Sequence, residues 1–190
     1  MKRNWKKEVF SIPNILTCCR LLLIPVYTTL YLRAETKADF LLAASILALS
    51  CLTDLADGQI ARRCHMITTL GKILDPIADK ATQATLILCL ALRYPILWYL
   101  MGLFVLKEGF QLAAGLLTLR TGRMLSGALF AGKFSTACLF TTLTLLVLLP
   151  EIPYGYVLAF TVLDGAVLLA AFLAYALAYF KKRADQFQKV

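Results

Sequence analysis

The chain has 190 residues, of which 60% are hydrophobic and 16% are charged, and its mean hydropathy is +0.74. This composition excludes an ordinary soluble domain, which needs a charged surface, and it predicts a protein that crosses a membrane several times. The net charge of +9 fits basic loops against an anionic membrane surface, with no nucleic-acid partner. The 6 cysteines form no C-x-x-C pair and lie mostly in apolar stretches, which argues against a disulfide framework or a zinc site.

The first eleven residues place Trp5, Val9 and Phe10 among lysines, which predicts a short helix on the inner membrane surface rather than a secretory leader. The apolar stretches that follow predict an all-α fold with six membrane spans, because about 20 helical residues cross a hydrocarbon core of about 30 Å. We expect the spans at residues 15–32, 40–60, 73–92, 96–117, 129–149 and 157–180. Little chain remains outside them, so residues 1–190 are expected to form one membrane domain.

Basic residues are concentrated at both ends of the chain and in the turns after the second and fourth expected spans. The terminal clusters are Lys2, Arg3, Lys6 and Lys7, and Lys181, Lys182, Arg183 and Lys189. Because lysine and arginine accumulate on the cytoplasmic side of membrane proteins, this pattern predicts cytoplasmic termini in a multi-pass protein of the cell membrane.

Polar residues recur at intervals of three in the first expected span, at Asn14, Thr17 and Arg20. On a helix such residues share a face, which points toward a bound ligand in one interpretation. In the other interpretation Asn14 and Thr17 cap the helix, and Arg20 reaches the membrane interface. The sequence leaves both open.

Two pairs of aspartates interrupt the apolar sequence: Asp54 and Asp57, three residues apart, and Asp75 and Asp79, four residues apart. Each pair lies on one face of a helix, and a turn between two antiparallel spans brings the pairs to a similar depth. Four carboxylates at that depth repel one another and lose hydration, so they need compensating cations. Two divalent ions would neutralise them, and the sequence therefore predicts a two-metal centre and an enzyme.

Small residues and an arginine accompany the aspartates: Gly58 and Ala61 on the stripe of the first pair, Arg62 at its inner end, and Gly71 before the second pair. Small side chains permit a bulky ligand to approach, and arginine makes bidentate contacts to phosphate. The arrangement indicates a cradle for a phosphate held by metal ions. Asp164 in the last span has no role in it and is expected to be a polar group in helix packing.

From Asp54 to Asp79 the residues follow the pattern D-x-x-D-G-x-x-A-R, eight residues, G-x-x-x-D-x-x-x-D. This pattern resembles the signature of the CDP-alcohol phosphotransferases, membrane enzymes that transfer a phosphatidyl or related group and release CMP. The opening P-N-x-L-T-x-x-R, from Pro13 to Arg20, resembles the phosphatidylglycerophosphate synthase and cardiolipin synthase branches. The likeness extends over the six-helix layout of nearly the whole chain.

The resemblance implies a role for each matching residue. Asp54, Asp57 and Asp75 would bind one Mg²⁺ or Mn²⁺ ion, and Asp54, Asp75 and Asp79 a second. Asp79 would also be the general base that takes the proton from the acceptor hydroxyl. The donor, CDP-diacylglycerol, would contact Gly58, Ala61, Arg62, Thr68, Gly71, Asn14 and Thr17. The resemblance also implies a homodimer.

The expected acceptor is glycerol 3-phosphate, whose phosphate needs cations besides the metals. The candidates are Arg20, Lys107, Arg120, Arg123 and Lys133, each of which is equally explained by membrane topology. Lys107-Glu108 departs from the Arg-Glu of many phosphatidylglycerophosphate synthases, so phosphatidylglycerol, the acceptor of a cardiolipin synthase, stays an alternative.

Other protein classes also use intramembrane acids. Aromatic prenyltransferases have two aspartate motifs, but these stand farther apart in the chain. A divalent-cation transporter would continue its acids across the membrane, whereas the third span has none beyond Asp79. An enzyme that opens to one side of the membrane is the favoured interpretation.

Overall fold

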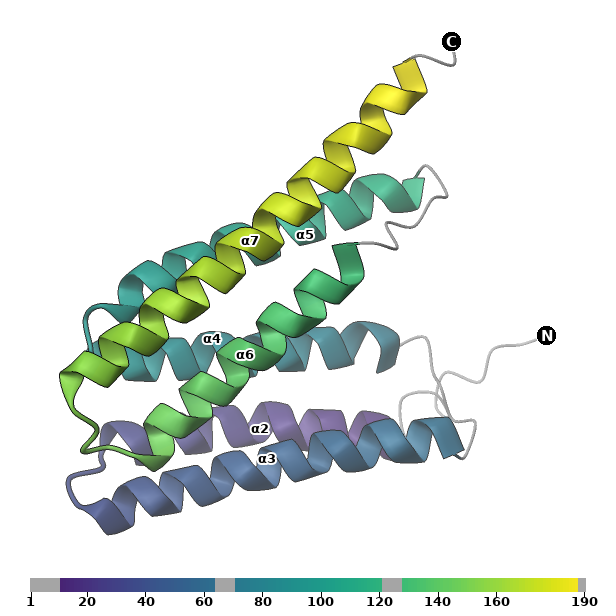
Figure 1. Ribbon diagram of the computed structural model, residues 1–190. Coiled ribbons are helices and arrows are strands. Elements are labelled where there is room, and N and C mark those ends of the chain that lie inside the picture. Colours follow the sequence, from purple (N-terminus) through teal and green to yellow (C-terminus); the bar gives the residue numbers. More distant parts are fainter. Residues whose placement is uncertain (1–10, 64–70, 121–127, 188–190) are drawn as a thin grey trace. The chain divides into compact units, whose positions relative to one another are not determined.

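The computed structural model describes residues 11–63, 71–120 and 128–187, and all regular structure in these ranges is α-helical (Figure 1). The helices are α2 (Ile12–Leu32), α3 (Lys37–Arg63), α4 (Gly71–Arg93), α5 (Leu97–Arg120), α6 (Ala128–Leu148) and α7 (Tyr154–Phe187). The prediction of an all-α fold is confirmed, and each expected span falls on one helix.

Three segments of the described helices are long and apolar enough to cross a membrane: Pro13–Leu32, Phe130–Leu148 and Tyr154–Phe180. The helices α3, α4 and α5 have 27, 23 and 24 residues, which is sufficient length for a bilayer, but they contain more charged residues. The count of six spans therefore stays a prediction. The expected interfacial helix falls on residues 1–11, which lie outside the described part except for Ser11.

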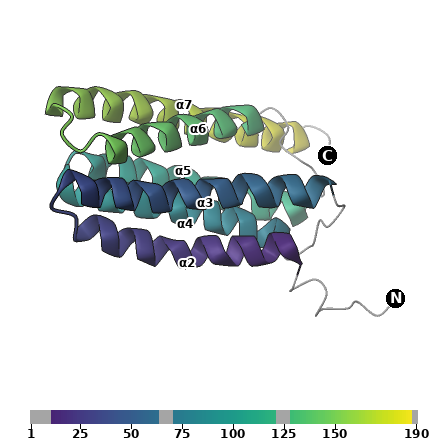
Figure 2. The same cartoon turned by 90° about the horizontal axis from the view of Figure 1, so that it is seen from below.

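The helices fall into two compact units, of which the first ends at Cys89 and the second begins at Leu90. In the first unit, α2 and α3 are antiparallel neighbours (Figure 2). Ala43, Ala44 and Leu47 follow the helical spacing and are buried between the helices. Near the connecting turn, Tyr31 stacks edge-on against Phe40 with 5.5 Å between the ring centres. This pairing fixes where α3 begins relative to α2.

A capping box starts α3. The backbone N–H of Thr36 donates to Asp39 Oδ2 at 2.9 Å, and the N–H of Asp39 donates to Thr36 Oγ1 at 3.3 Å. The backbone N–H of Thr36, the Thr36 hydroxyl and the N–H of Glu35 all donate to this carboxylate and lower the pKa of Asp39. The first turn of a helix has unpaired N–H groups, and this reciprocal pair satisfies two of them.

We expect Asp39→Ala to lower the thermal unfolding midpoint of the purified protein at neutral pH. The folded-state pKa is below the unfolded one, so the stabilisation is present above the unfolded pKa and is lost as the pH falls through the folded pKa. The difference in midpoint between wild type and variant should therefore shrink on acidification below pH ~4. A difference that stays constant between neutral pH and pH ~3 would contradict this account of the cap.

In the second unit, α7 packs against both α5 and α6. Phe110 of α5 meets Phe172 of α7 edge-on, with ring centres 5.2 Å apart. Gly132 allows α6 to approach α7 closely, because a Cβ at this position would lie 2.7 Å from the Tyr175 hydroxyl oxygen. At the other end of the unit, the Arg93 guanidinium donates to the carbonyl of Pro150 at 2.8 Å. This contact joins the turn before α5 to the turn before α7.

Candidate active site

The polar face of α2 is buried in the first unit. Asn14, Thr17 and Arg20 are each 2% exposed or less. The N-cap of α2 is Ser11, so Asn14 and Thr17 lie within the helix and do not cap it. Arg20 is buried among other residues of the chain rather than extended to a membrane interface, and the orientation of this face toward a bound ligand stays a prediction.

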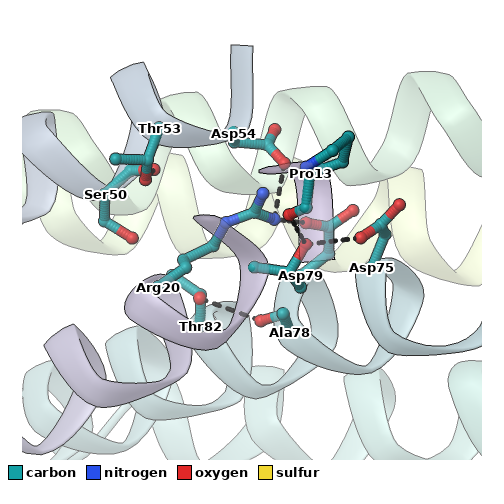
Figure 3. A network of polar contacts seen from close by, with 10 residues as sticks. Pro13, Arg20, Ser50, Thr53, Asp54, Asp75, Ala78, Asp79 and Thr82 are labelled. Carbon is teal, nitrogen blue, oxygen red and sulfur yellow. Dashed lines mark hydrogen bonds and ion pairs between the residues drawn. The ribbon is translucent and has the colours of Figure 1, made fainter. Parts of the chain in front are cut away.

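Arg20 lies beside Asp54 of α3 and Asp79 of α4, with Asp75 of α4 close by (Figure 3). Arg20 Nη1 lies 2.5 Å from Asp54 Oδ1 and 2.6 Å from Asp79 Oδ1. Counted along the helices, Asp54 and Asp79 lie about 12 to 14 Å from the α3 end and the α4 start. The predicted meeting of the two aspartate pairs at one depth is thus seen for one member of each.

Asp75 is held by the preceding polar residue of α2. The Thr17 hydroxyl donates to Asp75 Oδ1 at 2.7 Å, and its oxygen also lies 3.0 Å from the Pro13 carbonyl. A hydroxyl has one proton, and the shorter distance and the negative charge favour the carboxylate as its acceptor. Thr17 and Arg20, one turn apart, therefore each fix an aspartate of α4. The prediction that Thr17 contacts the donor is not tested by this contact.

The donor atoms of this aspartate cluster, which we define as Asp54, Asp75 and Asp79, suit a hard divalent cation. All are carboxylate oxygens, which are the ligands that Mg²⁺ prefers. The Oδ1 atoms of Asp54 and Asp79 both lie next to Arg20 Nη1, at 2.5 and 2.6 Å, whereas Mg²⁺–oxygen distances are about 2.0–2.1 Å. As the side chains stand, however, no three Asp, Glu, His or Cys residues within the described ranges are grouped closely enough to hold a metal. The residues fit a metal site in the chemistry of their side chains, while Arg20 occupies the position between two of the expected ligands.

The other predicted residues of the signature lie around the turn between α3 and α4. Asp57, Gly58, Ala61 and Arg62 belong to α3, but their side chains are outside the described part. Thr68 falls wholly outside it. Gly71 is the first residue of α4 and is buried, and its predicted contact with the donor stays a prediction.

The candidate residues for the acceptor phosphate belong partly to the first unit and partly to the second. Arg20 belongs to the first unit and contacts Asp54 and Asp79. In the second, Lys107 is 2% exposed and its Nζ lies 2.7 Å from Glu108 Oε1, whereas Lys133 is exposed. The side chain of Arg120 and the whole of Arg123 lie outside the described residues. An acceptor role stays a prediction for all five.

Asp164 of α7 is 1% exposed, and its Oδ2 has no hydrogen-bond partner among the described residues. The prediction that it takes part in helix packing agrees with this burial.

The ion pairs of Arg20 are the part of the site that sequence reasoning missed. The signal was present, since a guanidinium in an apolar helix keeps its charge and requires an anionic partner. The intervals between Arg20 and the aspartates did not reveal which residues would provide it.

Comparison with known proteins identifies the family to which this chain belongs. The sequence description of the CDP-alcohol phosphatidyltransferase family matches residues 10–179. The chain belongs to the CDP-alcohol phosphatidyltransferase family. The matched range includes the polar face of α2, both aspartate pairs and most of α7, so the predicted resemblance is confirmed for the chain as a whole.

The relatives include two kinds of enzyme. The chain is 37% identical over 114 residues to a protein of Drosophila melanogaster named "Probable cardiolipin synthase (CMP-forming)", covering 60% of this chain and 34% of the relative. It is 36% identical over 88 residues to the "CDP-diacylglycerol--glycerol-3-phosphate 3-phosphatidyltransferase" of Pseudomonas fluorescens, covering 46% and 45%. It is 30% identical over 166 residues to the "Probable phosphatidylglycerophosphate synthase" of Mycobacterium tuberculosis (strain ATCC 25618 / H37Rv), covering 86% and 78%. The chain thus spans less than half the length of the first two relatives and most of the third.

Proposed function

We propose that this protein transfers the phosphatidyl group from CDP-diacylglycerol to glycerol 3-phosphate, giving phosphatidylglycerophosphate and CMP. The observation that carries the proposal is the convergence of Asp54 and Asp79 on one cationic nitrogen, with Asp75 held beside them by Thr17. The membership of the family gives this cluster its reaction class.

Asp54, Asp57, Asp75 and Asp79 would hold two divalent ions, Mg²⁺ or Mn²⁺. When bound, such ions neutralise the bridging phosphates of the donor and stabilise the departing CMP. Asp79 would accept the proton of the acceptor hydroxyl, for which it must come within hydrogen-bond reach of that oxygen. Its side chain is 47% exposed, so an acceptor has access to it. The buried face of α2 would keep Asp75 and Asp79 in place from the opposite side.

Glycerol 3-phosphate is the favoured acceptor for two reasons. The relative named "Probable phosphatidylglycerophosphate synthase" aligns with 86% of this chain, whereas the Drosophila relative aligns with 60%. The candidate cations of α5 and α6 also suit an acceptor with a phosphate of its own. The second candidate is a cardiolipin synthase that uses phosphatidylglycerol, which is supported by the higher identity of 37% to the Drosophila relative.

The proposal includes a setting. The protein would be a single domain that crosses the cell membrane six times, with both termini and the active site on the cytoplasmic side, and it would work as a homodimer. The basic residues at both ends of the sequence support this orientation.

The acceptor is tested by incubating the purified protein in lipid nanodiscs with CDP-diacylglycerol, Mg²⁺ and one acceptor at a time. We expect CMP release and phosphatidylglycerophosphate with glycerol 3-phosphate. CMP release with phosphatidylglycerol alone would replace the proposal with the cardiolipin synthase. No CMP with any acceptor, together with Mn²⁺ uptake by sealed proteoliposomes, would indicate the transporter.

A further inference from the structure

We infer that Arg20 is an internal counter-cation of the aspartate cluster, which holds Asp54 and Asp79 together until a divalent ion displaces its guanidinium. The inference rests on the proposed function, because it concerns how the proposed metal site is kept assembled before metal binds. It gives Arg20 a role different from the acceptor-phosphate contact expected from the sequence.

The first argument is that the Arg20 guanidinium is a buried charge. The Arg20 side chain is 3% exposed, and a guanidinium keeps its charge throughout the physiological pH range. A buried charge without a partner is strongly destabilising, and among the described side chains Arg20 pairs with carboxylates on two different helices. Arg20 therefore joins α2 to both α3 and α4 at the level of the cluster.

The second argument is the difference in exposure across the cluster. The Asp54 and Asp79 side chains are 46% and 47% exposed, whereas the guanidinium that they share is almost wholly covered. Arg20 thus approaches the carboxylates from the closed side, and an ion from outside can approach them from the open side. This geometry permits exchange of one cation for the other without separation of the helices.

The third argument is mutual exclusion. Nη1 lies 2.5 and 2.6 Å from the two Oδ1 atoms, and Mg²⁺ would lie about 2.1 Å from the same atoms. An ion bound to both oxygens would be within a few ångströms of Nη1, where two cations repel each other. Metal binding through these atoms therefore requires the guanidinium to leave, and a departed guanidinium becomes available to an anionic phosphate.

The inference predicts that Arg20 competes with metal. We propose measuring Mn²⁺ binding to the substrate-free, full-length protein in nanodiscs by the electron paramagnetic resonance signal of free Mn²⁺. Removal of the competing charge in Arg20→Gln should tighten Mn²⁺ binding about tenfold or more. Arg20→Lys keeps the charge and should tighten it less. An unchanged or weaker Mn²⁺ affinity in Arg20→Gln would overturn the inference. If Arg20→Gln does not accumulate as folded protein, the same result in Arg20→Lys would overturn it.

Lys80→Gln is the matched control for a general charge effect, since it removes one positive charge from the residue next to Asp79. It should tighten Mn²⁺ binding less than Arg20→Gln does, because Lys80 is partly exposed to screening solvent, whereas the buried Arg20 guanidinium lies against both Oδ1 atoms. Equal tightening in Lys80→Gln and Arg20→Gln would show a general charge effect and would also overturn the inference.

Chemical complementation tests occupancy directly. Arg20→Ala leaves room for a free guanidinium, so millimolar methylguanidinium should weaken Mn²⁺ binding to this variant but not to wild type. No competition in the variant would contradict occupancy of the metal position. If the wild type binds Mn²⁺ and releases CMP, and the Arg20 variants bind Mn²⁺ with the same affinity, this inference alone is wrong. A wild type that binds no Mn²⁺ would remove the proposed metal site as well.

Discussion

Asp79→Asn is expected to lower CMP release by about 10² to 10⁴-fold, the contribution that a general base makes to catalysis. The amide has nearly the size of the carboxylate, so packing around α4 should be unchanged, but it cannot take the proton of the acceptor hydroxyl. CDP-diacylglycerol binding should stay close to that of wild type, because three of the four proposed aspartate ligands remain. Turnover measured as CMP release, together with donor binding measured by equilibrium titration, separates the two effects.

The matched control for that substitution is Asp164→Asn, which makes the same chemical change at a buried position of α7. Its folded fraction should keep turnover within about twofold of wild type, because Asp164 has no proposed role in metal binding or proton transfer. Near-normal turnover in Asp79→Asn would move the role of base to another residue. A loss of donor binding equal to the loss of turnover would assign Asp79 to metal binding alone.

The helices of this fold were predictable because bilayer thickness restricts their length. The expected span at residues 96–117 corresponds to α5, Leu97–Arg120, and the span at 129–149 corresponds to α6, Ala128–Leu148. The ends were less predictable. The last helix continues to Phe187, beyond the apolar stretch that ends at residue 180. An apolar stretch predicts where a membrane span ends, but a helix can continue through the charged residues that follow.

The site was predictable as far as helical periodicity reaches. Residues three or four apart share a face, so the placement of Thr17 with Arg20 and of Asp75 with Asp79 follows from spacing alone. The pairing between helices does not follow from spacing. Either Thr17 or Arg20 had the chemistry to contact Asp79, and the rotation of α2 against α4 decides that Arg20 reaches Asp79 and Thr17 reaches Asp75.

Electrostatics explains why Arg20 was assigned elsewhere. From the sequence, four aspartates required cations from outside, and Arg20 was available for a phosphate. In the structure a cation of the chain itself, Arg20, pairs with Asp54 and Asp79. One guanidinium compensates only part of the charge of the three aspartates in the cluster, so the cluster keeps an excess of negative charge that divalent ions can neutralise.

Asp54→Ala is expected to remove metal binding and turnover together. Asp54 belongs to both proposed ion sites and to the ion pair with Arg20, so its loss removes a ligand from each ion, while the ion pair of Arg20 with Asp79 remains. Loss of an outer-sphere partner weakens metal binding 10- to 100-fold, so loss of a direct ligand should raise the Mn²⁺ dissociation constant by at least about 100-fold. CMP release should fall in proportion and should recover in part at high Mn²⁺ concentration.

Asp39→Ala is the control on the same helix, because it removes an acid from the start of α3 and should leave Mn²⁺ affinity as in wild type. If Asp54→Ala bound Mn²⁺ as tightly as wild type yet released no CMP, Asp54 would act on substrate rather than on metal. Recovery of turnover at high Mn²⁺ distinguishes these cases, since added metal compensates for a weakened ion site but not for a missing contact to substrate. The same titration compares Asp54 with Arg20, whose replacement should shift the Mn²⁺ dissociation constant in the opposite direction.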